Sequence, residues 1–282
     1  MRLSTAQIET LLSEDVPCGD LTTRSLGIAG RMGRMTFTAR QAMVLCGVEE
    51  AVRLLTVAGA EVRTMRVSGQ ACEEGVLLLE ASGTAEALFA GWKAAQTLVE
   101  WASGVATATQ RIISAARKAS PAIKVLCTRK SIPFTKALSV KAVLAGGGDM
   151  HRLGLSDSIM LFPEYHGFAH PDCDFRSMIG ALKARMPEQA VMVEVKSFED
   201  AVAASEAMAD VIQLEKFDPA AVERVVSAIP KRADGRPTIA AAGGINAANA
   251  ETYARVGVDT LVTSAPFYAP PADVQVVISP TD

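Results

Sequence analysis

The stretch AIKVLCTRKSIPFTKALSVKAVLAGGGDMHR, residues 122–152, has the pattern of a β-strand followed by an α-helix. Its aliphatic start, residues 122–127, predicts a buried strand, and Thr128-Arg129-Lys130 follow at the strand end. Three consecutive glycines and then His151-Arg152 close the stretch. Arginine offers paired donors to carboxylate or phosphate oxygens, lysine adds a point charge, and histidine can bind or move a proton. The stretch therefore predicts an α/β unit that holds an anion.

The same strand-then-helix rhythm continues after this stretch. Short β-branched or aliphatic runs alternate with amphipathic helical segments, which is typical of a parallel sheet or an α/β barrel. The predicted strands are residues 122–127, 157–162, 190–195, 210–214, 237–242 and 258–263. The tail, residues 266–282, has prolines at Pro266, Pro270 and Pro271 and is expected to leave the barrel and form one more edge strand at 273–278.

The residues before the stretch have a different pattern. A short helix over 4–14 precedes a loop through Asp20, and alternating residues predict strands near 34–40, 60–67 and 75–81, with a helix from about Val48 to Ala58. This indicates an antiparallel or mixed sheet with helices. Residues 84–118 are helical for most of their length, and Ser103-Gly104 is the expected break between two domains.

Composition limits the classes of function. The chain has 282 residues, 49% hydrophobic residues and a formal net charge of -3, so we expect a globular protein that does not bind nucleic acid through bulk charge. It has no signal-peptide pattern and no apolar run of about 18 residues, so we expect no membrane segment and a cytoplasmic location. Five scattered cysteines without a CxxC pair suit reduced thiols.

Polar residues follow almost every predicted barrel strand. Active sites of α/β barrels lie at the carboxyl ends of the strands, so these residues are expected to meet in one site. The residues at the predicted strand ends are Thr128-Arg129-Lys130, Phe162, Glu194 and Lys196, Glu215-Lys216, Gly243-Gly244, and Thr263-Ser264.

Two of these strand ends suggest specific chemistry. Gly243-Gly244, with a helix capped by Asn246 and with Ser264 on the next strand, predicts a phosphate-binding turn, although a tight turn alone would also explain the glycines. Glu194 and Glu215 suit ligation of Mg²⁺ or hydrogen bonding to sugar hydroxyls. The alternative is that they form salt bridges with nearby cations. Those cations are Lys196, Lys216, Arg129 and Lys130.

With these positions in hand, the chain resembles the quinolinate phosphoribosyltransferase family, also called carboxylating nicotinate-nucleotide pyrophosphorylases. The matching motifs are Glu14-Asp15 through Gly19-Asp20-Leu21-Thr22-Thr23, Ser103-Gly104-Val105-Ala106-Thr107, the 128–152 signature, Gly243-Gly244-Ile245 and Gly257-Val258-Asp259. The resemblance implies an N-terminal α/β-sandwich domain over 1–107, to which the tail 266–282 returns. It also implies an incomplete α/β barrel of six or seven parallel strands over 108–265, and a homodimer with the active site at the subunit interface.

The resemblance also implies an activity. A ring nitrogen of a heterocyclic acid attacks the anomeric carbon of phosphoribosyl pyrophosphate, which is held with the cofactor Mg²⁺, and pyrophosphate leaves. Arg129, His151 and Arg152 would face the acid. Lys130 would bind phosphate oxygens and act as a catalytic residue, as would Glu194 and Glu215, which would serve the ribose and the metal.

Several positions depart from the family pattern. Phe162 stands where a lysine of the substrate pocket is usual, Lys93 aligns with an arginine supplied across the dimer, Ala240 replaces an acid, and Glu215 stands for aspartate. These departures resemble the ModD-type branch associated with molybdate transport. We therefore expect an acceptor other than quinolinate, or a weak quinolinate activity. The alternatives are a genuine quinolinate phosphoribosyltransferase of NAD biosynthesis and a non-catalytic sensor of a nucleotide or oxyanion.

Overall fold

The computed structural model describes residues 2–168, 174–229 and 237–281. The chain divides into two compact units. The first unit contains Met1–Gln110, Ser131–Gly147 and Pro266–Asp282, and the second contains Arg111–Lys130 and Gly148–Ala265. No helix among the described residues is both long and apolar enough to cross a membrane.

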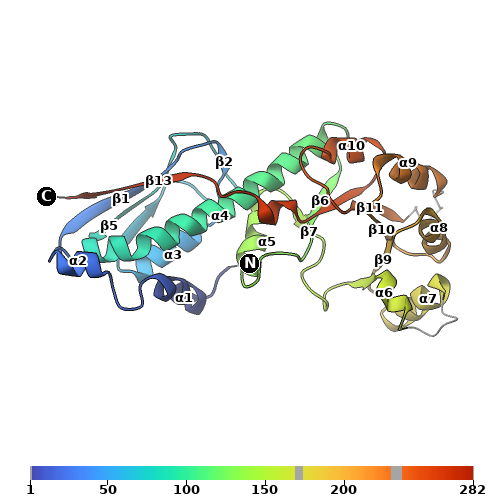
Figure 1. The fold of residues 1–282 in the computed structure, drawn as a ribbon, viewed down its shortest axis with the longest axis horizontal. Helices are drawn as coiled ribbons and strands as arrows, with labels where there is room; N and C mark the ends of the chain where they lie inside the picture. Colours follow the sequence, from blue (N-terminus) through green and yellow to red (C-terminus); the bar gives the residue numbers. More distant parts are fainter. Residues whose placement is uncertain (1, 169–173, 230–236, 282) are drawn as a thin grey trace. The chain divides into compact units, whose positions relative to one another are not determined.

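The first unit is built on a four-stranded antiparallel sheet in the order β13-β1-β5-β3 (Figure 1). The strands are β1 (Met32–Ala39), β3 (Glu61–Thr64), β5 (Leu77–Thr84) and β13 (Val274–Pro280), and a separate pair is formed by β2 (Met43–Val44) and β4 (Ala71–Cys72). The predicted return of the tail as an edge strand is confirmed, because β13 pairs along β1.

Five helices belong wholly or partly to this unit: α1 (Thr5–Asp15), α2 (Leu21–Ser25), α3 (Val48–Val57), α4 (Ala85–Arg117) and α5 (Lys136–Ala145). α1 begins at a capping box, in which the Ser4 hydroxyl accepts from Gln7 N and the Gln7 amide oxygen accepts from Ser4 N. The loop expected after Asp20 is instead the short helix α2, because the Asp20 carboxylate accepts from the backbone N–H groups of Thr22 and Thr23 and so caps it.

The predicted break at Ser103-Gly104 is wrong, because α4 runs unbroken for 33 residues. Ser103 is fully buried, and its hydroxyl accepts a hydrogen bond from Cys46 N at 2.9 Å. A Cβ on Gly104 would overlap the backbone carbonyl of Pro270. These small residues therefore permit close packing against the middle of the helix and do not end it.

The second unit is a curled seven-stranded sheet in the order β7-β6-β12-β11-β10-β9-β8, and every pairing in it is parallel. The strands are β6 (Lys124–Cys127), β7 (Asp149–Met150), β8 (Ile159–Leu161), β9 (Val191–Val195), β10 (Val211–Glu215), β11 (Thr238–Ala242) and β12 (Thr260–Thr263). The six predicted strands are present, and the two-residue β7 adds a seventh. The expected incomplete barrel is confirmed.

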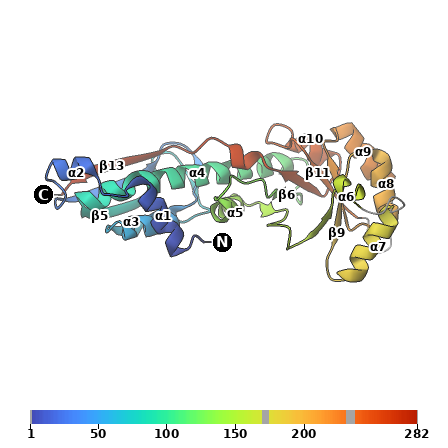
Figure 2. The same cartoon turned by 60° about the horizontal axis from the view of Figure 1, so that its bottom comes forward.

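The two faces of this sheet differ because side chains alternate along each strand. The outward residues, such as Val193, Leu214 and Ala241, belong to one apolar cluster. They are covered by α7 (Phe175–Arg185), α8 (Phe198–Glu206), α9 (Pro219–Ala228) and α10 (Ala250–Arg255), as Figure 2 shows. The remaining helical elements are α6 (Pro163–His166) and the 3₁₀ turn η1 (Ala265–Tyr268). The inward face carries Glu194 and Glu215.

Residues 131–147 group with the first unit, whereas the sequence analysis placed them in the barrel domain. α5 is held to α3 by Lys141, whose Nζ lies 2.7 Å from a Glu49 oxygen and also bonds the buried Glu50. Gly146 ends α5 against α4, and a Cβ there would overlap the Ala106 carbonyl and lie 2.7 Å from Thr109 Cβ. Gly146, the first of the three glycines that we had included in the anion-binding stretch, thus serves packing.

We predict that Gly146→Ala lowers the free energy of unfolding by about 1 to 3 kcal/mol, because the added methyl group overpacks the contact with α4. The control is Gly180→Ala in α7, where nothing lies within 4 Å of the added Cβ, so the substitution should raise stability by about 0.5 to 1 kcal/mol. Urea denaturation followed by circular dichroism measures both. Equal stability of Gly146→Ala and wild type would contradict the packing role.

Candidate active site

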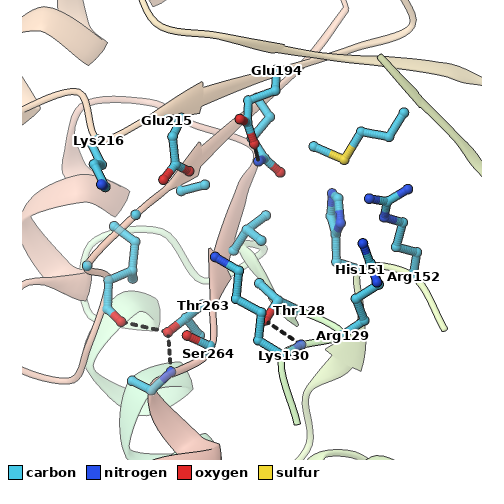
Figure 3. A pocket seen from close by; sticks show the side chains of 18 of the residues that line it. Thr128, Arg129, Lys130, His151, Arg152, Glu194, Glu215, Lys216, Thr263 and Ser264 are labelled. Carbon is cyan, nitrogen blue, oxygen red and sulfur yellow. Dashed lines mark hydrogen bonds between the residues drawn. The ribbon is translucent and has the colours of Figure 1, made fainter. Parts of the chain in front are cut away.

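The inward face of the parallel sheet opens into a pocket of about 810 Å³ whose lining lies entirely in the second unit (Figure 3). Each of the seven strands contributes to this lining at or just beyond its carboxyl end. The lining includes all the predicted site residues except Lys93. They are Arg129, Lys130, His151, Arg152, Phe162, Glu194, Glu215, Gly243, Gly244 and Ser264.

Cations from two neighbouring strands gather at one side of the pocket. Arg129 and Lys130 follow β6, and His151 and Arg152 follow β7. The backbone holds both segments, because Thr128 N donates to Thr263 O at 2.9 Å and His151 N donates to Cys127 O at 2.8 Å. Arg129, His151 and Arg152 therefore lie together, as Figure 3 shows.

His151 and Arg152 are set up to meet an anion. Burial and the nearby charge of Arg152 lower the pKa of His151 to about 4, and its Nε2 is buried without a hydrogen-bond partner among the described residues. Arg152 is only 6% exposed, and burial and Arg129 lower its pKa. A buried polar atom without a partner is costly, so a bound group that bonds these side chains gains free energy.

Acids gather on the neighbouring strands β9 and β10. Glu194 and Glu215 point into the pocket (Figure 3), and burial together with the charge of Glu215 raises the pKa of Glu194. Lys196, which was considered as a partner for them, instead pairs with Glu164 at 3.4 Å. Within the described chain neither Glu194 nor Glu215 forms an ion pair, so the salt-bridge alternative is not seen there.

The turn after β11 is left-handed at both glycines, with φ of 91° at Gly243 and 80° at Gly244. A Cβ on Gly243 would lie 2.9 Å from Lys216 N, so only glycine fits the close approach of these two strand ends. The expected helix cap at Asn246 is wrong, because α10 begins at Ala250.

Asn246 has a different role in this turn. Its amide and that of Asn249 both donate to Gly244 O, at 3.1 and 3.0 Å. The hydroxyl of Thr263, next to Ser264, donates to Ile245 O at 2.6 Å. The turn is therefore braced by side chains from its own loop and from β12.

Phe162 forms an apolar wall at the position where the resemblance implied that a lysine is usual. Its ring stacks on Tyr165 with centroids 6.3 Å apart, and the Arg152 guanidinium carbon lies 5.0 Å from its centroid. A cation over an aromatic face is favourable, so Phe162 holds Arg152 in place without adding charge.

Two predicted features lie outside this pocket. Lys93 is on α4 in the first unit, where its Nζ lies 3.0 Å from Gln96 Oε1 and 4.4 Å from the Trp92 ring centroid. Ala240 is buried on β11 and does not line the pocket. The His166 ring packs against Phe175, and His170 lies outside the described residues.

The main residue that the sequence analysis missed is Gln213. It lies on β10 two residues before Glu215, and its Nε2 donates to Glu194 Oε2 at 2.8 Å. A signal was available, because Gln213 is a polar residue within the apolar run Val-Ile-Gln-Leu-Glu and shares its face with Glu215.

The donor set of the pocket suits a hard divalent cation that shares its ligands with a substrate. In the described parts of the chain, no three His, Cys, Asp or Glu side chains form a metal-binding group. Mg²⁺ commonly takes one or two carboxylates and completes its shell with phosphate oxygens and water. Glu194 and Glu215 supply such a pair, and a cation between them would relieve the repulsion that raises the pKa of Glu194.

Known proteins match the chain over nearly its whole length. The N-terminal domain model of quinolinate phosphoribosyl transferase matches residues 20–103, and the C-terminal domain model matches residues 105–277. The chain belongs to the quinolinate phosphoribosyl transferase family. It is therefore an enzyme of the phosphoribosyltransferase and pyrophosphorylase class, as the sequence had indicated.

Individual relatives agree with this membership. The chain is 51% identical to "Putative pyrophosphorylase ModD" of Rhodobacter capsulatus, over 88% of this chain and 94% of the relative. It is 38% identical to the protein of the same name from Escherichia coli O157:H7, over 99% and 98%. The structure of NadC from Streptococcus pyogenes matches with a TM-score of 0.88 at 25% identity, over the full length of both chains. The expected likeness to the ModD-type branch is thus confirmed.

We predict that His151 stays neutral well below its ordinary pKa. The unfolded chain takes up this proton near pH 6.5 and the folded protein near pH 4, so in this window the unfolded state binds more protons and stability falls as the pH falls. The full loss, reached below about pH 4, should amount to about 3 kcal/mol. Proton NMR titration of the histidine ring signals checks the pKa, and His151→Gln identifies the signal and should remove the pH slope. A His151 signal titrating at pH 6 or above would disprove this.

Proposed function

We propose that the enzyme transfers the phosphoribosyl group of phosphoribosyl pyrophosphate to a ring nitrogen of a heterocyclic acid, with release of pyrophosphate and with Mg²⁺ as cofactor. The observation that carries the proposal is the segregation of charge in one pocket. Arg129, His151 and Arg152 lie at one side, and Glu194 and Glu215 lie at another (Figure 3). Such a pocket suits a reaction that joins an anionic acceptor to a sugar that becomes positively charged.

The roles of the residues follow from the chemistry. As the bond to pyrophosphate breaks, the ribose gains oxocarbenium character and the leaving group gains negative charge. Glu194 and Glu215 stabilise positive charge at the sugar, and Lys130 neutralises phosphate oxygens beside the Gly243-Gly244 turn and Ser264. Bound Mg²⁺ would supply further positive charge at the pyrophosphate, held by Glu194 and Glu215. Binding both reactants in one pocket raises the reaction rate further, because it holds the ring nitrogen and the anomeric carbon in the orientation for attack.

The acceptor is proposed to carry its acid group toward Arg129, His151 and Arg152 and an apolar edge toward Phe162. A charge-assisted hydrogen bond contributes about 1.5 to 3 kcal/mol, so replacing a pocket lysine by Phe162 removes one to two decades of affinity for a second carboxylate. A heterocycle with one carboxylate therefore fits better than the dicarboxylate quinolinate. The relatives named as probable nicotinate-nucleotide pyrophosphorylases, such as that of Methanocaldococcus jannaschii at 28% identity, are more distant than the ModD proteins.

We also propose a homodimer in which Lys93 of each subunit completes the pocket of the other. The support is that Lys93 is on α4 of the first unit, borders a hollow there with Glu14 and Asp15, and does not line the pocket of the second unit. An ammonium group keeps the charge of the family's arginine but lacks its paired donors.

The test is to incubate the protein with phosphoribosyl pyrophosphate, Mg²⁺ and a panel of pyridine and related heterocyclic acids, and to follow pyrophosphate and the nucleotide product. We expect one monocarboxylic acid to give product, and Lys130→Met to lower kcat/KM by about 100-fold or more because a phosphate contact is lost. Absence of product with every acceptor, while a nucleotide still protects the protein against melting, would favour a sensor and overturn the enzymatic proposal.

We predict that Phe162→Lys raises kcat/KM for quinolinate by about tenfold or more, because it restores a cation beside Arg152. Phe162→Met is the matched control, since it removes the ring without adding charge. Steady-state kinetics of the two variants and the wild type measure the effect. If lysine and methionine give the same quinolinate activity, the missing charge does not set the preference.

A further inference from the structure

Gln213 is a buried amide at the acidic side of the pocket. Its side chain lines the pocket, yet the residue is only 5% exposed. Parallel pairing of β9 with β10 puts Gln213 level with Glu194, and the two side chains bond across the strands at 2.8 Å. Glutamine has two donors and one acceptor oxygen to satisfy, so one bond to Glu194 leaves most of its capacity unused.

The bond to Glu194 fixes which way the amide faces. An ionised carboxylate only accepts hydrogen bonds, so Nε2 must face Glu194 and Oε1 must face away from it. Oε1 is buried and has no hydrogen-bond partner among the described residues. Leaving a buried acceptor unsatisfied is unfavourable, so the pocket is primed to take a donor at this position.

The neighbours of Gln213 decide what kind of donor enters. Glu194 lies beside it on β9, and Glu215 follows it on the same face of β10. These carboxylates repel the acid group of a heterocyclic acceptor, which belongs with the cations across the pocket. On its other side Gln213 pairs in register with Ala240, a small residue that takes little space. A neutral group with adjacent hydroxyl donors fits this surface.

We propose that Gln213 is a specificity residue for the sugar, and that its Oε1 accepts a hydrogen bond from one hydroxyl of the ribose diol while Glu194 accepts from the other. The inference rests on the proposed function, because it assigns a further residue to the phosphoribosyl half of the same pocket. Oε1 is covered by neighbouring atoms, so the hydroxyl reaches it with a small side-chain shift on entry. Gln213 thereby selects a ribosyl over a deoxyribosyl substrate.

The experiment compares binding of ribose 5-phosphate, 2-deoxyribose 5-phosphate and 3-deoxyribose 5-phosphate by calorimetry. Wild type should bind the ribose compound at least about tenfold more tightly than either deoxy sugar, the difference expected for one buried hydrogen bond. Gln213→Met keeps the length of the side chain but removes the amide. It should reduce the discrimination against one of the two deoxy sugars by about tenfold.

Met192→Leu is the matched control, since Met192 is buried on β9 one pleat before Glu194 and does not line the pocket. It should keep the wild-type discrimination, and near-ultraviolet circular dichroism verifies that both variants fold. Should Gln213→Met not fold, the wild-type comparison still decides, because equal binding of all three sugars overturns the proposal. An unchanged preference in folded Gln213→Met overturns it as well.

Two prior measurements separate this inference from the function on which it rests. Binding of phosphoribosyl pyrophosphate and release of pyrophosphate by the wild type are determined first. Their absence overturns the proposed function itself. With both present, a preference for ribose that does not depend on Gln213 overturns only the role of this residue.

Discussion

The strict alternation of side chains along β9, β10 and β11 is the constraint on which the rest of the second unit depends. Val193, Leu214 and Ala241 face outward into one apolar cluster under the helices. The intervening positions must then face inward, where Glu194 and Glu215 line the pocket. A shift of one residue in any strand would bury the acids among the aliphatic side chains. The same hydrophobic pattern that stabilises the sheet therefore also orients the acidic side of the site.

Parallel pairing adds a second constraint, because all seven strands end at the same edge of the sheet. Cations from β6 and β7 and acids from β9 and β10 thus lie at different sides of one pocket (Figure 3). Keeping opposite charges apart costs stability, and His151 Nε2 and Gln213 Oε1 are buried in this pocket without a hydrogen-bond partner among the described residues. This loss of stability is consistent with a site whose charged groups find their partners in bound substrates. In the proposed reaction these are an anionic acceptor and a ribose with free hydroxyl groups.

The sequence predicted best those features for which a local pattern is compatible with only one structure. The aliphatic runs predicted six barrel strands, and the polar residues after them predicted most of the pocket. Prediction failed where tertiary packing decides. Ser103-Gly104 resembles a helix break, yet both residues lie within α4 because Cys46 and Pro270 approach the helix closely there. The glycine run that starts at Gly146 likewise resembles part of an anion site. Gly146 is instead a contact with α4, which the local sequence does not reveal.

Gln213 and Phe162 illustrate what a family resemblance leaves open. The fold agrees with the family, whereas these two residues set the character of the walls on either side of Glu194. Phe162 directly follows Leu161, which pairs with Val193, so Phe162, Glu194 and Gln213 occupy successive strands at one level. None of these three side chains carries a positive charge. The row is therefore less favourable for a second carboxylate than it would be with a lysine at position 162. Because recognition of a charged group depends on every partner in contact with it, changes confined to this row can alter the acceptor while the phosphoribosyl chemistry is retained.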